Sequence, residues 1–152
     1  RIAVETTQQM LEASLSAAKN AQLFIGTAAV ADYAPAATST QKIKKKTEAL
    51  SLPLIKTTDI LMAVREAHPQ LFMVGFAAET EKLEQHAREK LRGKQLQLVA
   101  ANDVSGGKVF ERDNNTLHVF WDGGERLLAP QSKTETAREL AALICEHFLA
   151  RN

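Results

Sequence analysis

Three nearly continuous apolar stretches constrain the fold of this chain more than any other feature of its sequence. They cover residues 23–30, 71–78 and 96–101, and they lack the alternation of apolar and polar residues that a half-exposed strand shows. Strands of this kind usually have both faces covered by helices, as in a parallel sheet. A chain built around them is expected to form a layered α/β domain.

The segments between these strands complete the pattern. Apolar residues at helical spacing predict helices over residues 7–19, 59–67, 79 to about 93, and 137–148. Short strands are expected at residues 2–4, 52–55, 116–121 and 126–129. Turns are expected at Gly106–Gly107, Asn114–Asn115 and Asp122–Gly124. The predicted fold is a three-layer α/β/α Rossmann-like domain, with a mostly parallel sheet and an antiparallel hairpin strand near its end.

Helix-capping residues precede three of the predicted helices. Thr6–Thr7 and Asp59 are suited to accept hydrogen bonds from the first free amides of a helix. Ser132 and Glu135 have the spacing of a capping box, in which serine and glutamate satisfy reciprocal backbone donors. These signals set where the helices are expected to begin.

Composition limits the classes of function. The 152 residues fit a single domain with its own core, and we find no linker or internal repeat. A net charge of +1 does not favour binding to nucleic acid or to a membrane surface. The single cysteine, Cys145, allows no internal disulfide and is expected to be buried and structural. Without a signal peptide or an apolar run of about 18 residues, the chain is expected to be cytoplasmic.

Small and polar residues follow the predicted strands directly. In open parallel sheets, ligands bind beyond the carboxyl ends of the strands. Four stretches fall at such ends, namely residues 28–35, 56–59, 75–80 and 102–105. The first runs into residues 32–48, which are expected to form an irregular loop of a length that is usually functional. The convergence predicts a nucleotide or other polyphosphate site, although neither a P-loop nor a G-x-G-x-x-G motif is present.

Lysines at two places are candidates for the positive charge of such a site. Residues 42–46 contain four lysines, which would either stabilise charge on leaving phosphates or form a solvated loop. Lys90 and Lys94 lie one helical turn apart on one face. They would either grip two phosphates or remain an exposed part of the helix.

Two further residues allow both a structural and a functional interpretation. Asp32 is either a turn former for its own loop or a ligand for a metal ion or sugar hydroxyl. Phe76, between two small residues, belongs either to the core or to the surroundings of a base. The four histidines lack the spacing of zinc ligands with one another and with Cys145, so no zinc site is predicted.

Four motifs follow one another in a specific order along the chain. They are Ala-Ala-Val-Ala-Asp-Tyr at residues 28–33, Lys-Ile-Lys-Lys at 42–45, Gly-Phe-Ala-Ala-Glu-Thr at 75–80 and Ala-Asn-Asp-Val-Ser at 101–105. Together with the Lys90/Lys94 pair, they resemble the phosphopantothenoylcysteine synthetase family. That domain is usually the carboxy-terminal half of the bifunctional decarboxylase/synthetase of coenzyme A biosynthesis. The resemblance covers essentially the whole chain.

The resemblance implies a CTP-dependent ligase. CTP would activate the carboxylate of 4′-phosphopantothenate as an acyl-cytidylate, with release of pyrophosphate. The amine of L-cysteine would then attack, release CMP and form the amide. The resemblance further implies Mg²⁺ with the phosphates, a flavin-dependent decarboxylase fused upstream, and a homodimer whose subunit contact lies near residues 29–37.

The same resemblance assigns residues to the CTP site. The residues implied to contact the nucleotide are Gly26, Thr27, Ala28, Asp32, Lys42, Ile55, Lys56, Thr57, Thr58, Phe76, Lys90 and Lys94. Residues 26–28 would meet the cytosine partly through backbone groups. Lys42 would contact the triphosphate and is the expected catalytic residue.

The chain departs from the family pattern in two respects. Thr57–Thr58 stand where the family commonly has Asn-Pro. The amino-terminal Gly-rich segment, which in the family carries an asparagine that stabilises the acyl-cytidylate, is expected to be missing, so these 152 residues are expected to bind CTP but to be catalytically incomplete. Two other classes of function therefore remain open: a non-catalytic nucleotide-binding domain, and a dinucleotide-dependent reductase without its Gly-rich turn.

Overall fold

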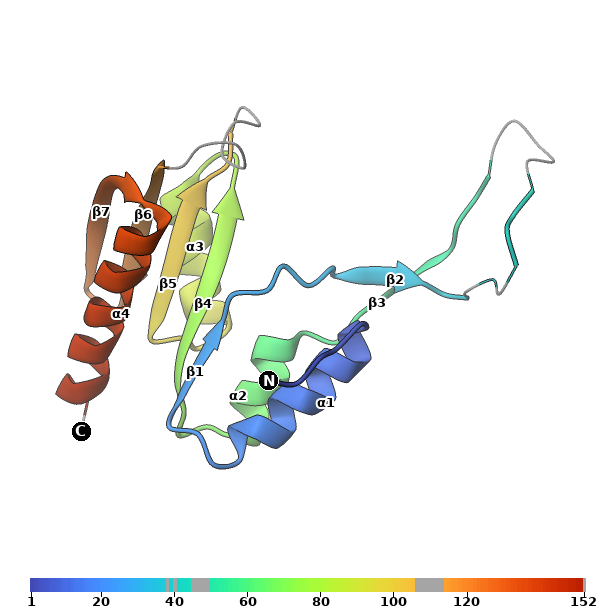
Figure 1. Cartoon of the computed structure of the whole chain (residues 1–152), viewed down its shortest axis with the longest axis horizontal. Coiled ribbons are helices and arrows are strands. Elements are labelled where there is room, and N and C mark those ends of the chain that lie inside the picture. The colour runs from blue at the N-terminus through green and yellow to red at the C-terminus, as the bar shows by residue number, and fades with distance from the viewer. Residues whose placement is uncertain (38, 40, 45–49, 106–113, 152) are drawn as a thin grey trace.

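Helices and strands alternate along the chain largely as the sequence predicts (Figure 1). The computed structural model describes residues 1–37, 39, 41–44, 50–105 and 114–151. Its elements are α1 (Thr7–Ala18), β1 (Leu23–Gly26), β2 (Tyr33–Pro35), β3 (Leu54–Lys56), α2 (Ile60–Ala67), β4 (Phe72–Glu79), α3 (Leu83–Gly93), β5 (Leu98–Asp103), β6 (Asn114–Trp121), β7 (Gly124–Ser132) and α4 (Lys133–Ala150).

The main sheet is mixed and mostly parallel. Within the described residues its strand order is β1-β4-β5-β6-β7. β1, β4 and β5 pair in parallel, whereas β6 runs antiparallel to both β5 and β7. Within this sheet, all strands except β6 therefore point the same way. This confirms the predicted, mostly parallel sheet with an antiparallel hairpin near its end.

Two separate clusters of buried side chains lie on opposite faces of this sheet. On one face, Val64 of α2 and Ala87 and Leu91 of α3 pack with Met73 of β4, together with the end of α1. On the other face, residues of α4 pack against Val74 and its neighbours. Consecutive residues of β4 thus supply different cores, as expected for a strand covered on both sides. The three-layer α/β/α arrangement is confirmed (Figure 1).

The predicted helix caps are present. Thr6 accepts a hydrogen bond from the Gln9 amide, and Ser132 accepts one from the Glu135 amide. Both helices have complete capping boxes, because the third helical residue also accepts from the backbone of the cap. Asp59 caps α2 by accepting from the Met62 amide at 3.1 Å. These contacts satisfy amides that have no partner within a helix.

The amino-terminal part of the sheet is shorter than predicted. Residues 2–4 form no strand, since no neighbouring strand of the described chain pairs with them. β1 ends at Gly26 rather than at residue 30, because the small residues that follow offer little side-chain area to pack on the sheet. As an edge strand it is only partly buried, and Ile25 is 42% exposed.

Two further expectations are wrong, and a third concerns residues outside the described part of the chain. Asn114–Asn115 do not form a turn; they begin β6 and pair with residues at the end of β7, and an irregularity in register follows at residues 115–117. Cys145 is exposed rather than buried, because it lies on the outer side of α4. The turn expected at Gly106–Gly107 lies outside the described residues.

A two-stranded arm is formed by β2, which lies within the predicted irregular loop, and β3, which corresponds to the short strand predicted at residues 52–55. β2 pairs antiparallel with β3, with Tyr33 opposite Lys56 and Pro35 opposite Leu54. At its base, the Thr57 amide donates to the carbonyl oxygen of Asp32 at 2.8 Å, and the Thr57 hydroxyl donates to that of Ala31 at 2.6 Å. The arm projects away from the main sheet in Figure 1. Residues 38, 40 and 45–49 lie outside the described part.

Candidate functional site

A cavity of about 670 Å³ lies at the carboxyl ends of β1, β4 and β5. This is the edge of the sheet at which the sequence predicted a ligand site. The segments that line it are β1 with the chain after it (residues 24–32), the start of α2 with the residues before it (57–61), and the end of β4 (76–78). Residues of α1, α3 and the β5 end complete the lining, namely Met10, Ser14, Lys90, Lys94, Asn102 and Val104. Segments from distant parts of the sequence therefore meet at one opening.

The structure brings most of the predicted site residues together. Those that line the cavity are Gly26, Thr27, Ala28, Asp32, Thr57, Thr58, Phe76, Lys90 and Lys94. Ile55 and Lys56 do not line it, because they belong to β3, where both are exposed on the arm. Lys42 does not line it either and lies exposed in the segment between β2 and β3.

Three residues at the start of α2 line the cavity, although none of them was among the residues assigned to the CTP site. They are Asp59, Ile60 and Leu61. A pair of glycines explains their position: Gly26 and Gly75 are opposite each other on β1 and β4. A Cβ atom at Gly26 would lie 2.8 Å from Leu61 Cδ2, and one at Gly75 would lie 3.5 Å from Leu61 Cδ1. Because these two positions carry no side chain, Leu61 can pack against β1 and β4 there, which brings the start of α2 to the opening.

Lys90 and Lys94 place positive charge at this opening from the same helix face. Lys90 Nζ donates a hydrogen bond to the carbonyl oxygen of Phe76 at 2.5 Å. Burial lowers the pKa of Lys90, and the neighbouring charge of Lys94 lowers it further. Glu79, Asp59 and Asp32 oppose this shift, so carboxylates surround the lysine at somewhat greater range.

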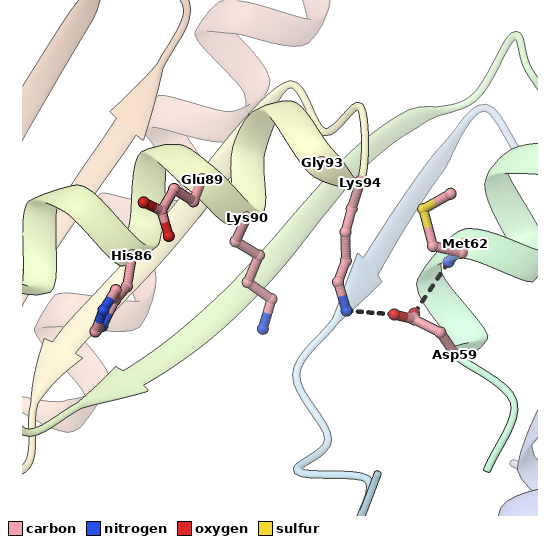
Figure 2. A pocket seen from close by; sticks show the side chains of 7 residues that line it. All are labelled: Asp59, Met62, His86, Glu89, Lys90, Gly93 and Lys94. Atoms are coloured by element: carbon pink, nitrogen blue, oxygen red, sulfur yellow. Dashed lines mark hydrogen bonds and ion pairs between the residues drawn. The ribbon is translucent and has the colours of Figure 1, made fainter. Parts of the chain in front are cut away.

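A second, shallower depression of about 570 Å³ adjoins the first, and Figure 2 shows the residues that line it. Its lining residues are Asp59, Met62, His86, Glu89, Lys90, Gly93 and Lys94. His86 Nδ1 lies 2.9 Å from Glu79 Oε2, which fixes the ring near the end of β4. Asp59, Lys90 and Lys94 line both depressions and thus separate them.

Two features are absent from the part of the chain that the structure describes. No group of three or more His, Cys, Asp or Glu side chains is arranged to hold a metal ion in that part of the chain. No helix in the same part is long and apolar enough to cross a bilayer. At the cavity itself, Lys90 and Lys94 can bind an anion, and the small residues leave backbone groups accessible.

Fold and site together define a Rossmann-like α/β domain with a lysine-lined cleft at the carboxyl ends of its parallel strands. Residues 1–148 match the family described as the DNA/pantothenate metabolism flavoprotein C-terminal domain, and the chain belongs to this family. The resemblance that was based on four short motifs is thereby confirmed at the level of the family.

Known proteins similar to the chain agree with this assignment. The coenzyme A biosynthesis bifunctional protein CoaBC of Haemophilus influenzae is 45% identical over 149 residues, which are 97% of this chain and 37% of that protein. A crystal structure of the C-terminal domain of CoaBC superposes with a TM-score of 0.79 at 33% identity, covering 99% of this chain and 66% of that one. A DNA/pantothenate metabolism flavoprotein from Streptococcus pneumoniae, at 23% identity and a TM-score of 0.76, covers 95% of this chain and 71% of that one and supports the fold.

The chain corresponds to only part of its relatives. It spans 37% of the Haemophilus protein and 36% of the Vibrio vulnificus one. The activities and substrates of those whole proteins are therefore considered for this chain only as proposals.

Proposed function

We propose that this chain is the CTP-binding part of a phosphopantothenate–cysteine ligase of coenzyme A biosynthesis. The observation that carries the proposal is the convergence of Lys90, Lys94, Phe76 and residues 26–28 on one cavity at the strand ends. The names of the relatives, which are bifunctional proteins of coenzyme A biosynthesis, agree with it. We further propose that the protein acts in the cytoplasm, fused to a flavin-dependent decarboxylase domain upstream.

In this proposal the cavity holds CTP with its base toward β1 and its phosphates toward α3. Gly26, Thr27 and Ala28 are small, so a base can approach their backbone groups closely. Phe76 lies at the end of β4 and lines the same cavity, where its ring can contact the base. Lys90 and Lys94 neutralise part of the triphosphate charge from the opposite side.

The reaction consists of two displacements. A carboxylate oxygen of 4′-phosphopantothenate attacks the α-phosphorus of CTP, and the bond to the β-phosphate oxygen breaks to release pyrophosphate. The amine nitrogen of L-cysteine then attacks the acyl carbon, loses a proton and releases CMP. The lysines stabilise the negative charge that develops on the leaving pyrophosphate, an effect that depends on their being positioned beforehand.

Mg²⁺ fits this cavity as a companion of the phosphates. Magnesium commonly binds through substrate phosphates, one or two carboxylates and several waters, rather than through a complete cage of protein ligands. Asp32 lines the cavity and is close enough to influence the charge of Lys90. Asp32 would therefore hold the ion together with the nucleotide, and the ion would offset phosphate charge.

The arm supports the proposed homodimer. Large apolar side chains on β2 and β3 are exposed to solvent: Tyr33 by 58%, Leu54 by 54% and Ile55 by 56%. A second copy of the chain, in contact near residues 29–37, would cover them. Light scattering should therefore give the mass of a dimer at concentrations where CTP binds, and a monomer at those concentrations would contradict the proposal.

Lys42 remains the proposed catalytic residue, acting from the arm rather than from the cavity wall. Lys42 is exposed between β2 and β3 and does not line the cavity, so in this proposal the arm approaches the bound triphosphate or a partner chain supplies the residue. Lys42→Gln in the full-length polypeptide should slow pyrophosphate release by about 10- to 100-fold, as expected for one lost charge-assisted phosphate contact. CTP affinity should change less. An unchanged rate of pyrophosphate release would rule out this role.

Calorimetric titration with CTP, ATP and NADPH, each with and without Mg²⁺, tests the proposed function. Clear preference for CTP supports the ligase. Similar, weak binding of CTP and ATP would favour a non-catalytic nucleotide-binding domain. Preference for NADPH would favour a dinucleotide-dependent reductase and overturn the proposal.

A further inference from the structure

One ion pair spans the boundary between the two depressions. Lys94 Nζ, at the carboxyl end of α3, lies 2.5 Å from Asp59 Oδ2, at the start of α2 (Figure 2). Both residues line both depressions, and their side chains are only 28% and 34% exposed. The pair therefore connects two helices across the opening at which the phosphates of a nucleotide are proposed to lie.

Asp59 holds this position independently of Lys94. Its other oxygen, Oδ1, accepts a hydrogen bond from the Met62 amide at 3.1 Å and caps α2. Burial alone would raise the pKa of the Asp59 carboxyl, but the contacts with Lys94 and the Met62 amide outweigh this and keep it below its usual value. Asp59 is thus an anchored carboxylate at neutral pH, and it would stay in place if Lys94 moved.

The ammonium groups of the two lysines at the opening have different contact partners. Lys94 contacts a carboxylate directly, whereas Lys90 donates to the uncharged carbonyl oxygen of Phe76. A polyphosphate that approaches this opening would meet Lys90 as a cation that no carboxylate of the described residues contacts directly. It would have to compete with Asp59 for Lys94, and it would be repelled by Asp59 at the same time.

We propose that Asp59 is a latch that holds Lys94 across the opening in the absence of ligand and gives it up to a bound polyphosphate. The inference rests on the proposed function in that CTP is the expected ligand. The latch keeps the long side chain of Lys94 beside the opening, and it lowers the apparent affinity because part of the binding free energy is used to separate the pair. Asp59 is in this sense a positioning residue that limits how tightly the triphosphate is held.

Asp59→Asn tests the latch with little change to the helix cap, because asparagine caps helices about as well as aspartate. The variant should bind CTP and inorganic tripolyphosphate about fivefold more tightly, since a partly exposed ion pair of this kind is worth up to about 1 kcal/mol. Its thermal unfolding should remain cooperative. Glu89→Gln removes a charge of the same sign from the rim of the second depression and should leave both affinities unchanged.

A double-mutant cycle separates the latch from a general effect of charge. In a Lys94→Met background, most of the gain from Asp59→Asn should disappear, because no ammonium remains to be released. A gain of the same size in both backgrounds would overturn the latch. Weaker or unchanged tripolyphosphate binding by Asp59→Asn would also overturn it, and so would a loss of CTP affinity seen only with Mg²⁺, which would make Asp59 a metal ligand.

Tripolyphosphate distinguishes failure of the latch from failure of the proposed function. Asp59→Asn could tighten tripolyphosphate binding while neither protein prefers CTP over ATP. The latch would then stand and the proposed specificity would fall. If the wild-type chain prefers CTP but Asp59→Asn binds both ligands as the wild type does, the proposed function stands and the latch falls.

Discussion

Lys90→Met is expected to weaken CTP binding by about 10- to 100-fold, as measured by calorimetric titration of the 152-residue chain. Lys90 is half-buried at the opening of the cavity, and its ammonium already donates a hydrogen bond to the Phe76 carbonyl oxygen at 2.5 Å. Methionine keeps a flexible apolar side chain of similar length but has no charge and no donor. A charge-assisted contact to phosphate is worth about 1.5–3 kcal/mol, which corresponds to the expected loss of affinity.

The matched control for this variant is Lys82→Met on the same helix. Lys82 is the exposed residue at the start of α3 and does not line the cavity. Lys82→Met removes the same charge from the chain, so it shows how far net charge alone changes the affinity for CTP. Equal, small effects of the two substitutions would contradict a specific phosphate contact at Lys90.

Arg65→Met is expected to lower the free energy of unfolding by about 2–4 kcal/mol in urea denaturation. Arg65 is only 6% exposed, and its Nη1 donates to the carbonyl oxygens of Pro69 at 2.7 Å and Leu71 at 3.0 Å. Its Nη2 donates to Gln97 Oε1, which also accepts the amide of Met73. Methionine would remove a charged donor from all three acceptors. The Leu71 oxygen would keep Arg151 and Gln97 Oε1 would keep the Met73 amide, so the loss consists of the charge-assisted bonds and the pairing of the Pro69 oxygen.

Part of this loss is offset, because the wild-type side chain is itself not fully satisfied. Arg65 Nε is buried without a hydrogen-bond partner among the described residues, and burial together with the nearby Arg151 lowers the pKa of the guanidinium. Arg92→Met, at an exposed position of α3, should change stability by less than about 0.5 kcal/mol. A loss below about 1 kcal/mol for Arg65→Met would show that the link from α2 to β4 and β5 is unimportant for stability.

The layered fold could be predicted because local patterns determine it. Residues 71–78 and 96–101 are apolar on both faces, so they could only be interior strands, and the capping box at Ser132 marked the start of α4 within the sequence itself. The arm could not be predicted in the same way. A short strand was predicted at residues 52–55, where β3 lies, but β2 fell within the predicted loop. Three residues are too few to show a periodicity, and β2 pairs with β3 across a long separation, with Tyr33 opposite Lys56.

The same distinction between local patterns and long-range packing applies to the candidate site. Gly26, Phe76 and the Lys90/Lys94 pair were predicted from strand ends, helical spacing and family motifs, and they meet at one cavity. Asp59 was predicted as a helix cap and as the end of one of the four strand-end stretches. Its contact with Lys94 could not be predicted, since it joins residues 35 positions apart and depends on how α2 and α3 pack. Ile55 and Lys56 were expected beside Thr57 at the site, but strand pairing in the arm carries them away from it.

The most direct test of the central proposal is a crystal structure of the chain with CTP and Mg²⁺. We expect the triphosphate within hydrogen-bonding distance of Lys90 Nζ and Lys94 Nζ, with Lys94 separated from Asp59 and the base beside residues 26–28. Nucleotide density elsewhere, or phosphates that contact neither lysine while the Asp59–Lys94 pair stays closed, would contradict it.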